Sequence, residues 1–232
     1  MIVDILLAAL VFYLVYRFRK ANQKQGQLTH KDEREWLYLD IAKKACDDGD
    51  SLKAIEYYRK IGDMGYAEAY VELGFMYRDG RCVLRNCLKA VEYYEKACNM
   101  GHARAYFELG FMYANGKCVP QDYFKAVDYY CEAAERGVSE AYCELGIMYN
   151  GGLGIPKDRS KVLEYYKKAA EMGSSVAYNN LGEMYRIGQD VPKDYSKATE
   201  YFQKAIKMGN TDAYDGLRKL YCSGYSTHQN LY

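Results

Sequence analysis

The dipeptide Ala-Tyr recurs at a constant interval, and this period constrains the fold more than any other feature of the chain. Its alanine stands at positions 69, 105, 141, 177 and 213, so that 36 residues separate each copy from the next. A fixed period without insertions indicates a repeat architecture, in which each unit packs mainly on its neighbours. We therefore predict a row of stacked units in place of a single globular core.

Each unit contains two segments whose apolar residues have helical spacing. In the four complete copies the first segment reads AEAYVELGFMY, ARAYFELGFMY, SEAYCELGIMY and SVAYNNLGEMY, and the second reads KAVEYYEKA, KAVDYYCEA, KVLEYYKKA and KATEYFQKA. An Asx residue that can cap the first turn precedes every second segment, namely Asp50, Asn86, Asp122, Asp158 and Asp194. The predicted fold class is all-α, a right-handed α/α solenoid of 36-residue helix-turn-helix repeats.

Four glycines lie inside the predicted first helices, at Gly74, Gly110, Gly146 and Gly182. Each costs about 1 kcal/mol relative to alanine in a helix interior. Close approach of a neighbouring helix would offset this repeated cost, so we predict a helix contact at each glycine.

The repeat register divides the chain into successive parts. They are an N-terminal membrane anchor (1–16), a basic linker (17–31), a degenerate N-terminal capping repeat (32–66), four full repeats (67–210), a C-terminal half repeat (211–224) and a tail (225–232). The end units differ from the middle ones, as expected where an outer face meets water.

The first 16 residues, MIVDILLAALVFYLVY, are apolar apart from Asp4, and basic residues follow at positions 17, 19, 20 and 24. A helix of this length spans about 24 Å, short of the roughly 30 Å hydrocarbon core, which leaves a signal peptide open. No basic residue precedes the apolar run and no small-residue cleavage site closes it, so we predict an uncleaved anchor. The positive-inside rule then predicts a single-pass membrane protein with cytosolic repeats. The alternative is an exported or periplasmic protein with a signal anchor.

The charge balance and the cysteines argue against several functions. Lys+Arg 32 against Asp+Glu 31 gives a net charge of +1, so no basic footprint indicates a nucleic-acid partner. The eight cysteines contain no C-x-x-C pair and the three histidines are scattered, so we predict no metal site. Cys82 and Cys118 are repeat equivalents, and stacked helices lie about 8–10 Å apart, beyond the roughly 7 Å that a disulfide spans. Reduced thiols and a reducing compartment are expected.

The sequence also lacks signs of catalysis. The triplets S-x-x-K, S-D-N and K-T-G are absent, and no histidine is flanked by an obvious nucleophile or an orienting acid. The recurrent residues all have packing explanations. We predict no catalytic residues and no cofactor, and therefore not an enzyme.

The recurring pattern AxxxLGxxY…G…D-x-x-K-A-x-x-Y-Y-x-K-A-x-x-x-G resembles the Sel-one-like repeat family, relatives of the tetratricopeptide repeats with a longer loop between the helices. The family's usual loop, G-x-G-V, survives only at residues 152–155, because Cys82, Cys118 and Asp190 replace the second glycine. The resemblance implies an adaptor or scaffold that binds proteins, often in membrane-associated complexes, and that seldom catalyses.

The first helices are expected to line the concave side of the solenoid, where their unpacked stripe would meet a partner. In the first three full repeats this stripe combines apolar residues with acids, and the predicted partner-binding residues are Val71, Glu72, Phe75, Phe107, Glu108, Phe111, Cys143, Glu144 and Ile147. The acids would steer a basic peptide or protein with apolar anchors. The alternative is that superhelical curvature buries Phe75, Phe107 and Phe111 against adjacent repeats.

The predicted function is a membrane-tethered protein–protein interaction scaffold or adaptor that binds a peptide or protein on the concave face. One alternative is an assembly factor for a membrane complex. A remote alternative is a secreted, cysteine-rich family member that binds or hydrolyses β-lactams. Such members staple each repeat with two cysteines eight residues apart, whereas the chain has Tyr106 at that spacing from Cys98.

Overall fold

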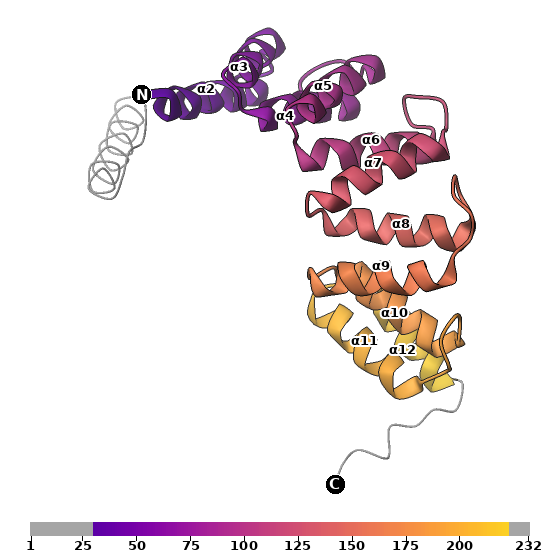
Figure 1. Cartoon of the computed structure of the whole chain (residues 1–232). Coiled ribbons are helices and arrows are strands. Elements are labelled where there is room, and N and C mark those ends of the chain that lie inside the picture. The colour runs from indigo at the N-terminus through magenta and orange to yellow at the C-terminus, as the bar shows by residue number, and fades with distance from the viewer. Residues whose placement is uncertain (1–29, 223–232) are drawn as a thin grey trace, which may run out of the picture. The chain divides into compact units, whose positions relative to one another are not determined.

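The computed structural model describes residues 30–222, with side chains from residue 34 onward (Figure 1). Over this range the regular secondary structure is entirely α-helical. None of the described helices is long and apolar enough to span a bilayer. The predicted membrane anchor (1–16), nearly all of the basic linker (17–31) and the tail (225–232) lie outside the described residues.

Each repeat contributes two short helices. The first helices are α4 (Ala67–Asp79), α6 (Ala103–Asn115), α8 (Ser139–Gly151), α10 (Ser175–Ile187) and α12 (Asp212–Cys222). The second helices are α3 (Ser51–Asp63), α5 (Cys87–Asn99), α7 (Tyr123–Glu135), α9 (Arg159–Glu171) and α11 (Tyr195–Lys207). α2 (His30–Asp47) precedes them and packs on α3.

The chain divides into two compact units, with the boundary after Ala69. The first unit contains the one tryptophan of the sequence, Trp36, which is 56% exposed on α2. In the second unit each helix from α5 to α12 packs on the next, as the stacked coils of Figure 1 show. The prediction of an all-α solenoid of helix pairs is confirmed.

The helix ends lie where the punctuation of the sequence predicts them. Asp50, Asn86, Asp122, Asp158 and Asp194 are N-caps, and each accepts a hydrogen bond from a backbone N–H of the first turn. Gly116, Gly152 and Gly188 end first helices in the left-handed conformation, which costs glycine least.

The interior glycines of the first helices meet an aromatic ring of the second helix in the same repeat. A Cβ added at Gly74, Gly110 or Gly146 would lie 2.3, 2.8 or 2.5 Å from the ring of Tyr94, Tyr130 or Tyr166, and one at Gly182 would lie 2.6 Å from Phe202. No real Cβ makes contacts this short, so the helices reach their observed separation only because these positions lack a side chain. The predicted helix contacts are confirmed.

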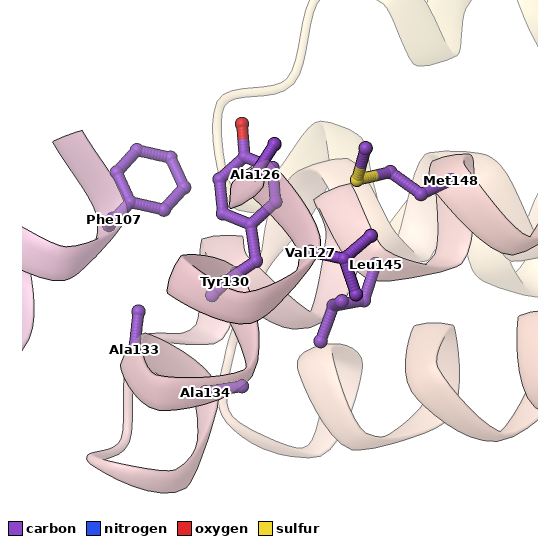
Figure 2. Packing of buried hydrophobic residues seen from close by; sticks show 9 residues of the cluster. Phe107, Ala126, Val127, Tyr130, Ala133, Ala134, Leu145 and Met148 are labelled. Carbon is purple, nitrogen blue, oxygen red and sulfur yellow. The ribbon is translucent and has the colours of Figure 1, made fainter. Parts of the chain in front are cut away.

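Figure 2 shows the core around one of these rings. Tyr130 is fully buried among residues of α6, α7 and α8, with the ring of Phe107 at 5.7 Å between centroids. Ala126, Val127, Leu145 and Met148 fill the rest of the cluster. The core is therefore continuous from one repeat to the next.

The abundant tyrosines form three-ring stacks, one in each full repeat. In every stack a second-helix ring lies between two first-helix rings, and the central rings are Tyr93, Tyr129, Tyr165 and Tyr201. A lysine lies over one outer ring of each stack, 4.8 to 5.3 Å from its centroid. The stacks hold the two helices of a repeat together and account for 12 of the 27 tyrosines.

The loops between paired helices retain the left-handed turn of the family pattern without its glycine. Cys82, Cys118 and Asp190 have φ values of 51°, 72° and 63°, close to the 69° of Gly154, their repeat equivalent. The replacement of glycine therefore leaves the local backbone conformation unchanged and places a side chain on it.

One of these side chains corrects the prediction of reduced thiols. Cys118 forms a disulfide with Cys87, the first residue of α5, across a Cα–Cα distance of 4.8 Å. The prediction was wrong because it compared Cys118 with its equivalent, Cys82, whereas the loop reaches back to the start of the preceding second helix. The equivalent residues of the next two repeats are also in contact at this junction between a loop and the start of the preceding second helix. Gly154 lies against the backbone of Tyr123, and Asp190 forms an ion pair with Arg159 at 3.1 Å.

Candidate partner-binding groove

A groove of about 640 Å³ lies along the first helices α4, α6 and α8. Its lining consists of three aromatic rings and seven charged side chains, namely Phe75, Phe107, Phe111, Glu72, Asp79, Glu108, Glu144, Arg78, Arg81 and Arg104. Its size lies within the range of ordinary ligand-binding clefts.

The structure brings six of the nine predicted partner-binding residues together in this groove. They are Glu72, Phe75, Phe107, Glu108, Phe111 and Glu144. Val71 and Cys143 are buried instead, and the Cys143 thiol contacts the Ser174 hydroxyl at 3.4 Å. Ile147 is 41% exposed on α8 but does not line the groove.

The three phenylalanines differ in burial. Phe107 is only 9% exposed, so the alternative of a buried ring holds for it, but the ring that it packs on, Tyr130, belongs to its own repeat and not to an adjacent one. Phe75 and Phe111 are half-buried and keep part of their surface in the groove. Phe107 thus forms the floor of the groove, whereas Phe75 and Phe111 remain accessible to a partner.

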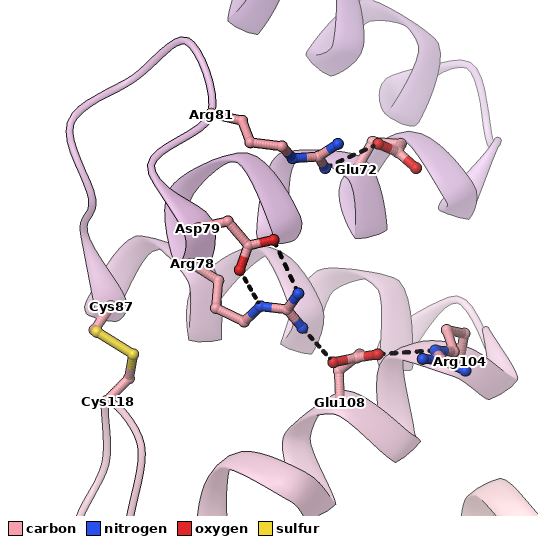
Figure 3. A network of polar contacts seen from close by, with 8 residues as sticks. All are labelled: Glu72, Arg78, Asp79, Arg81, Cys87, Arg104, Glu108 and Cys118. Atoms are coloured by element: carbon pink, nitrogen blue, oxygen red, sulfur yellow. Dashed lines mark hydrogen bonds and ion pairs between the residues drawn. A yellow bond between two sulfur atoms is a disulfide. The ribbon is translucent and has the colours of Figure 1, made fainter. Parts of the chain in front are cut away.

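Glu108 is the centre of a charged network, shown in Figure 3. Its carboxylate is 3% exposed and accepts hydrogen bonds from Arg78 Nη1 at 2.6 Å and from Arg104 Nε at 2.8 Å. Arg78 also makes two hydrogen bonds to Asp79, at 2.7 and 2.9 Å, and these lower the pKa of the Asp79 carboxyl. The buried carboxylate of Glu108 therefore has two close partners of opposite sign, as a buried charge requires.

The chain's own cations also cover the aromatic rings. Arg78 lies 4.8 Å from the centroid of Phe75, and Arg104 lies 4.8 Å from that of Phe107. Lys117 lies 4.9 Å from the centroid of Phe111. Sequence interpretation placed apolar rings beside acids but missed these cations. For Arg78 and Arg104 the spacing was the available signal, because side chains three residues apart on a helix are neighbours.

Glu144 differs from the other acids of the groove. It is half-buried, and among the described residues none forms an ion pair or hydrogen bond with its carboxylate. Burial raises the pKa of the Glu144 carboxyl, with no nearby cation to counter the effect.

Two buried hydroxyls lie near the charged groups of the groove. The hydroxyls of Tyr94 and Tyr130 have no hydrogen-bond partner in the described part of the chain. Burial raises the pKa of both phenols, and the Tyr130 hydroxyl lies within electrostatic range of Glu108 and Glu144. The lining thus contains one unpaired carboxylate, that of Glu144, and the two unpaired hydroxyls are buried beneath the charged groups, outside the lining.

The stacked helix pairs and the charged, aromatic groove define a two-helix repeat protein with an open lateral cleft. The chain belongs to the Sel1 repeat family, because the sequence model of the Sel1 repeat matches residues 47–66, 67–102, 103–138, 139–174 and 175–210. Proteins of this family generally mediate protein–protein interactions and are typically non-catalytic.

Solved structures with the same fold support this assignment. A protective antigen of uropathogenic Escherichia coli strains, which displays an SLR fold, is 32% identical over 76% of this chain, with a TM-score of 0.70. This chain spans only 38% of that antigen. A Sel1 repeat protein from Oxalobacter formigenes is 28% identical, with a TM-score of 0.72, over 80% of this chain and 76% of its own length. No curated protein matches the sequence.

Proposed function

We propose that the chain is a protein–protein interaction scaffold or adaptor that binds a peptide or protein segment in the groove of α4, α6 and α8. The observation that carries this proposal is the composition of the groove. Half-buried Phe75 and Phe111 offer apolar contact area, and charged groups surround them at fixed positions. Grooves that combine aromatic anchors with charges are suited to extended or helical peptides.

A membrane tether through residues 1–16 remains part of the proposal. It is supported by the apolar run and the basic residues that follow. A tethered scaffold would concentrate its partner at the bilayer, and an assembly factor for a membrane complex would use the same groove with a longer-lived partner.

The side of the membrane is a separate question. The distribution of positive charge favours cytosolic repeats. The Cys87–Cys118 disulfide favours the exported or periplasmic alternative, because disulfides persist mainly in oxidising compartments. Cys222 is free and exposed, so a membrane-impermeant thiol reagent applied to intact cells separates the two. Labelling of Cys222 from outside would rule out the cytosolic topology.

Crosslinking in intact membranes tests the groove itself. The double variant Phe75→Ala/Phe111→Ala should lose crosslinked partners that the wild type captures. Phe124→Ala is the matched control, because Phe124 is 73% exposed on α7 and does not line the groove. Circular dichroism would verify that both variants remain folded. Retention of every partner by a folded double variant would place binding elsewhere.

A further inference from the structure

Three acids of the groove are repeat equivalents, but they differ in whether a cation pairs with them. Glu72, Glu108 and Glu144 are separated by 36 residues each. Glu72 pairs with Arg81 at 3.4 Å, and Glu108 pairs with both Arg78 and Arg104. No such pair is formed by Glu144 with any described residue.

The sequence explains the exception position by position. The cations that serve Glu72 and Glu108 come from 30 residues before, four before or nine after the acid. For Glu144 these positions hold Ala114, Glu140 and Leu153. None of the three can supply a positive charge.

The aromatic ring beside each acid shows the same difference. Phe75 has two guanidinium groups over it, from Arg78 at 4.8 Å and from Arg81 at 5.9 Å. Its equivalent, Phe111, has only the counterpart of Arg81, which is Lys117 at 4.9 Å. The counterpart of Arg78 is Ala114, whose side chain is a single methyl group.

A half-buried carboxylate without a cation is unfavourable, because burial removes water without supplying a replacement. The groove lining as a whole contains four carboxylates, Glu72, Asp79, Glu108 and Glu144, against three guanidinium groups. The unpaired negative charge is therefore localised at Glu144, beside a ring that can stack with a planar cation.

We propose that the groove binds an arginine side chain of a protein partner. Its guanidinium pairs with Glu144 and stacks on Phe111, in the same way as Arg78 pairs with Glu108 and stacks on Phe75. The contact between Arg78 and Glu108 is an internal copy of the contact made with the partner. This inference rests on the proposed function of the groove and specifies its ligand.

Arginine fits this position better than lysine. The internal pair uses a guanidinium that stacks on a ring and donates several hydrogen bonds at once, and a lysine ammonium cannot do both. The buried Tyr130 hydroxyl, which lacks a hydrogen-bond partner among the described residues, lies near the same carboxylate and can share in the network.

The variant Ala114→Arg tests the geometry without a partner. It restores the counterpart of Arg78, so its own guanidinium should reach Glu144 and raise the melting temperature. Ala114→Gln is the matched uncharged control, and in a Glu144→Gln background the Ala114→Arg change should give no further gain over Glu144→Gln alone. An Ala114→Arg protein that melts no higher than Ala114→Gln would contradict the geometry.

Peptide selection tests the ligand. The full chain, in detergent micelles, is used to select from a bead-bound library of random nine-residue peptides. We expect arginine to be enriched among peptides that bind the wild type. Replacing that arginine by neutral citrulline, or Glu144 by glutamine, should weaken binding about tenfold or more, the size expected for a charge-assisted hydrogen bond. Ala114→Arg should block the same peptides, whereas Glu135→Gln, an exposed change on α7, should leave binding unaltered.

The outcomes separate the two proposals. Peptides that need Phe75 and Phe111 but show no enrichment in arginine would refute the arginine site and leave the groove in place. Selection of acidic peptides that need Arg81 or Arg104 would show that the groove takes the opposite charge. If none of the selected peptides depends on Phe75 and Phe111, both proposals fail.

Discussion

Gly146 illustrates how one residue sets the distance between two helices. Its missing side chain allows α8 to lie against the Tyr166 ring of α9, and a Cβ there would be 2.5 Å from a ring carbon. Alanine at this position has two opposing effects, a gain of about 1 kcal/mol in helix propensity and a loss of about 1–3 kcal/mol from overpacking.

We expect overpacking to prevail, so that Gly146→Ala lowers the free energy of unfolding by up to about 2 kcal/mol in chemical denaturation. Gly146→Leu should have a larger effect. In a Tyr166→Ala background the ring is gone, and the same Gly146→Ala change should become stabilising because only helix propensity remains. A destabilising effect of equal size in both backgrounds would show that the ring is not the cause.

Glu144 offers a second test at this scale, through pH. Folding raises the pKa of its carboxyl above the ordinary value of 4.5, so the folded state binds the proton more tightly than the unfolded state. The favourable contribution of Glu144 is thus present below the unfolded pKa and is lost as pH rises through the folded pKa.

We therefore expect Glu144→Gln to melt above the wild type at neutral pH and to lose this advantage as the pH falls through the folded pKa toward 4.5. Melting curves recorded from pH 4 to 8 would check this. The same substitution should weaken binding, and a gain in stability together with a loss of binding is not expected of a purely structural residue. A lower melting temperature at neutral pH would mean that Glu144 has a stabilising partner.

At the scale of elements, the loops before α7, α9 and α11 each contact the start of the preceding second helix, and each does so by a different kind of interaction. The three contacts are the Cys87–Cys118 disulfide, the backbone contact between Gly154 and Tyr123, and the Arg159–Asp190 ion pair. The carboxylate of Asp190 is 3% exposed, and its ion pair meets the distance but not the geometry of a hydrogen bond. These contacts hold successive repeats in register.

The disulfide should contribute most to stability. It closes a loop over a sequence separation of 31 residues, for which chain entropy predicts about 3–4 kcal/mol. We expect Cys87→Ala/Cys118→Ala to lower the free energy of unfolding by a similar amount, and a reductant to affect the wild type but not this double variant. Equal reductant sensitivity of the two proteins would show that this bond does not account for the effect.

Local signals made most of the elements predictable. Helix caps such as Asp122, terminal glycines and the interior Gly110 act within one turn or one helix pair, so the sequence pattern indicates them directly. The disulfide was missed because it depends on the path of the loop that contains Cys118. This loop places Cys118 next to Cys87, in the preceding repeat. The pairing of Glu108 with Arg78 was missed for the same reason, and the burial of Phe107 was left as an alternative, since both depend on contacts made by other helices.

At the scale of the whole molecule, the repeats share a length but are not interchangeable. Deletion of residues 103–138 or of 139–174 removes 36 residues and preserves the period. The first deletion would bring Cys87 opposite Gly154, which has no side chain to clash. The second would bring Tyr123 opposite Asp190, where even a Cβ on the present Gly154 would lie 2.5 Å from the Tyr123 carbonyl group.

The second deletion also removes Arg159, and Asp190 would then be buried without its cation. With both proteins kept reduced, we expect the 139–174 deletion to melt about 4–8 °C below the 103–138 deletion, which corresponds to about 2 kcal/mol. Differential scanning calorimetry would measure this. Equal melting temperatures would mean that stability does not depend on which residues meet where the loop contacts the preceding second helix.

The placement of Trp36 gives the molecule two independent optical signals. Its indole belongs to the unit that ends at Ala69, whereas the three-ring tyrosine stacks belong to the unit that begins at Tyr70. Tryptophan fluorescence therefore reports on the first unit alone, and the near-ultraviolet circular dichroism of the tyrosines is dominated by the second. Melting followed by both signals on one unlabelled sample would reveal whether the two units unfold together.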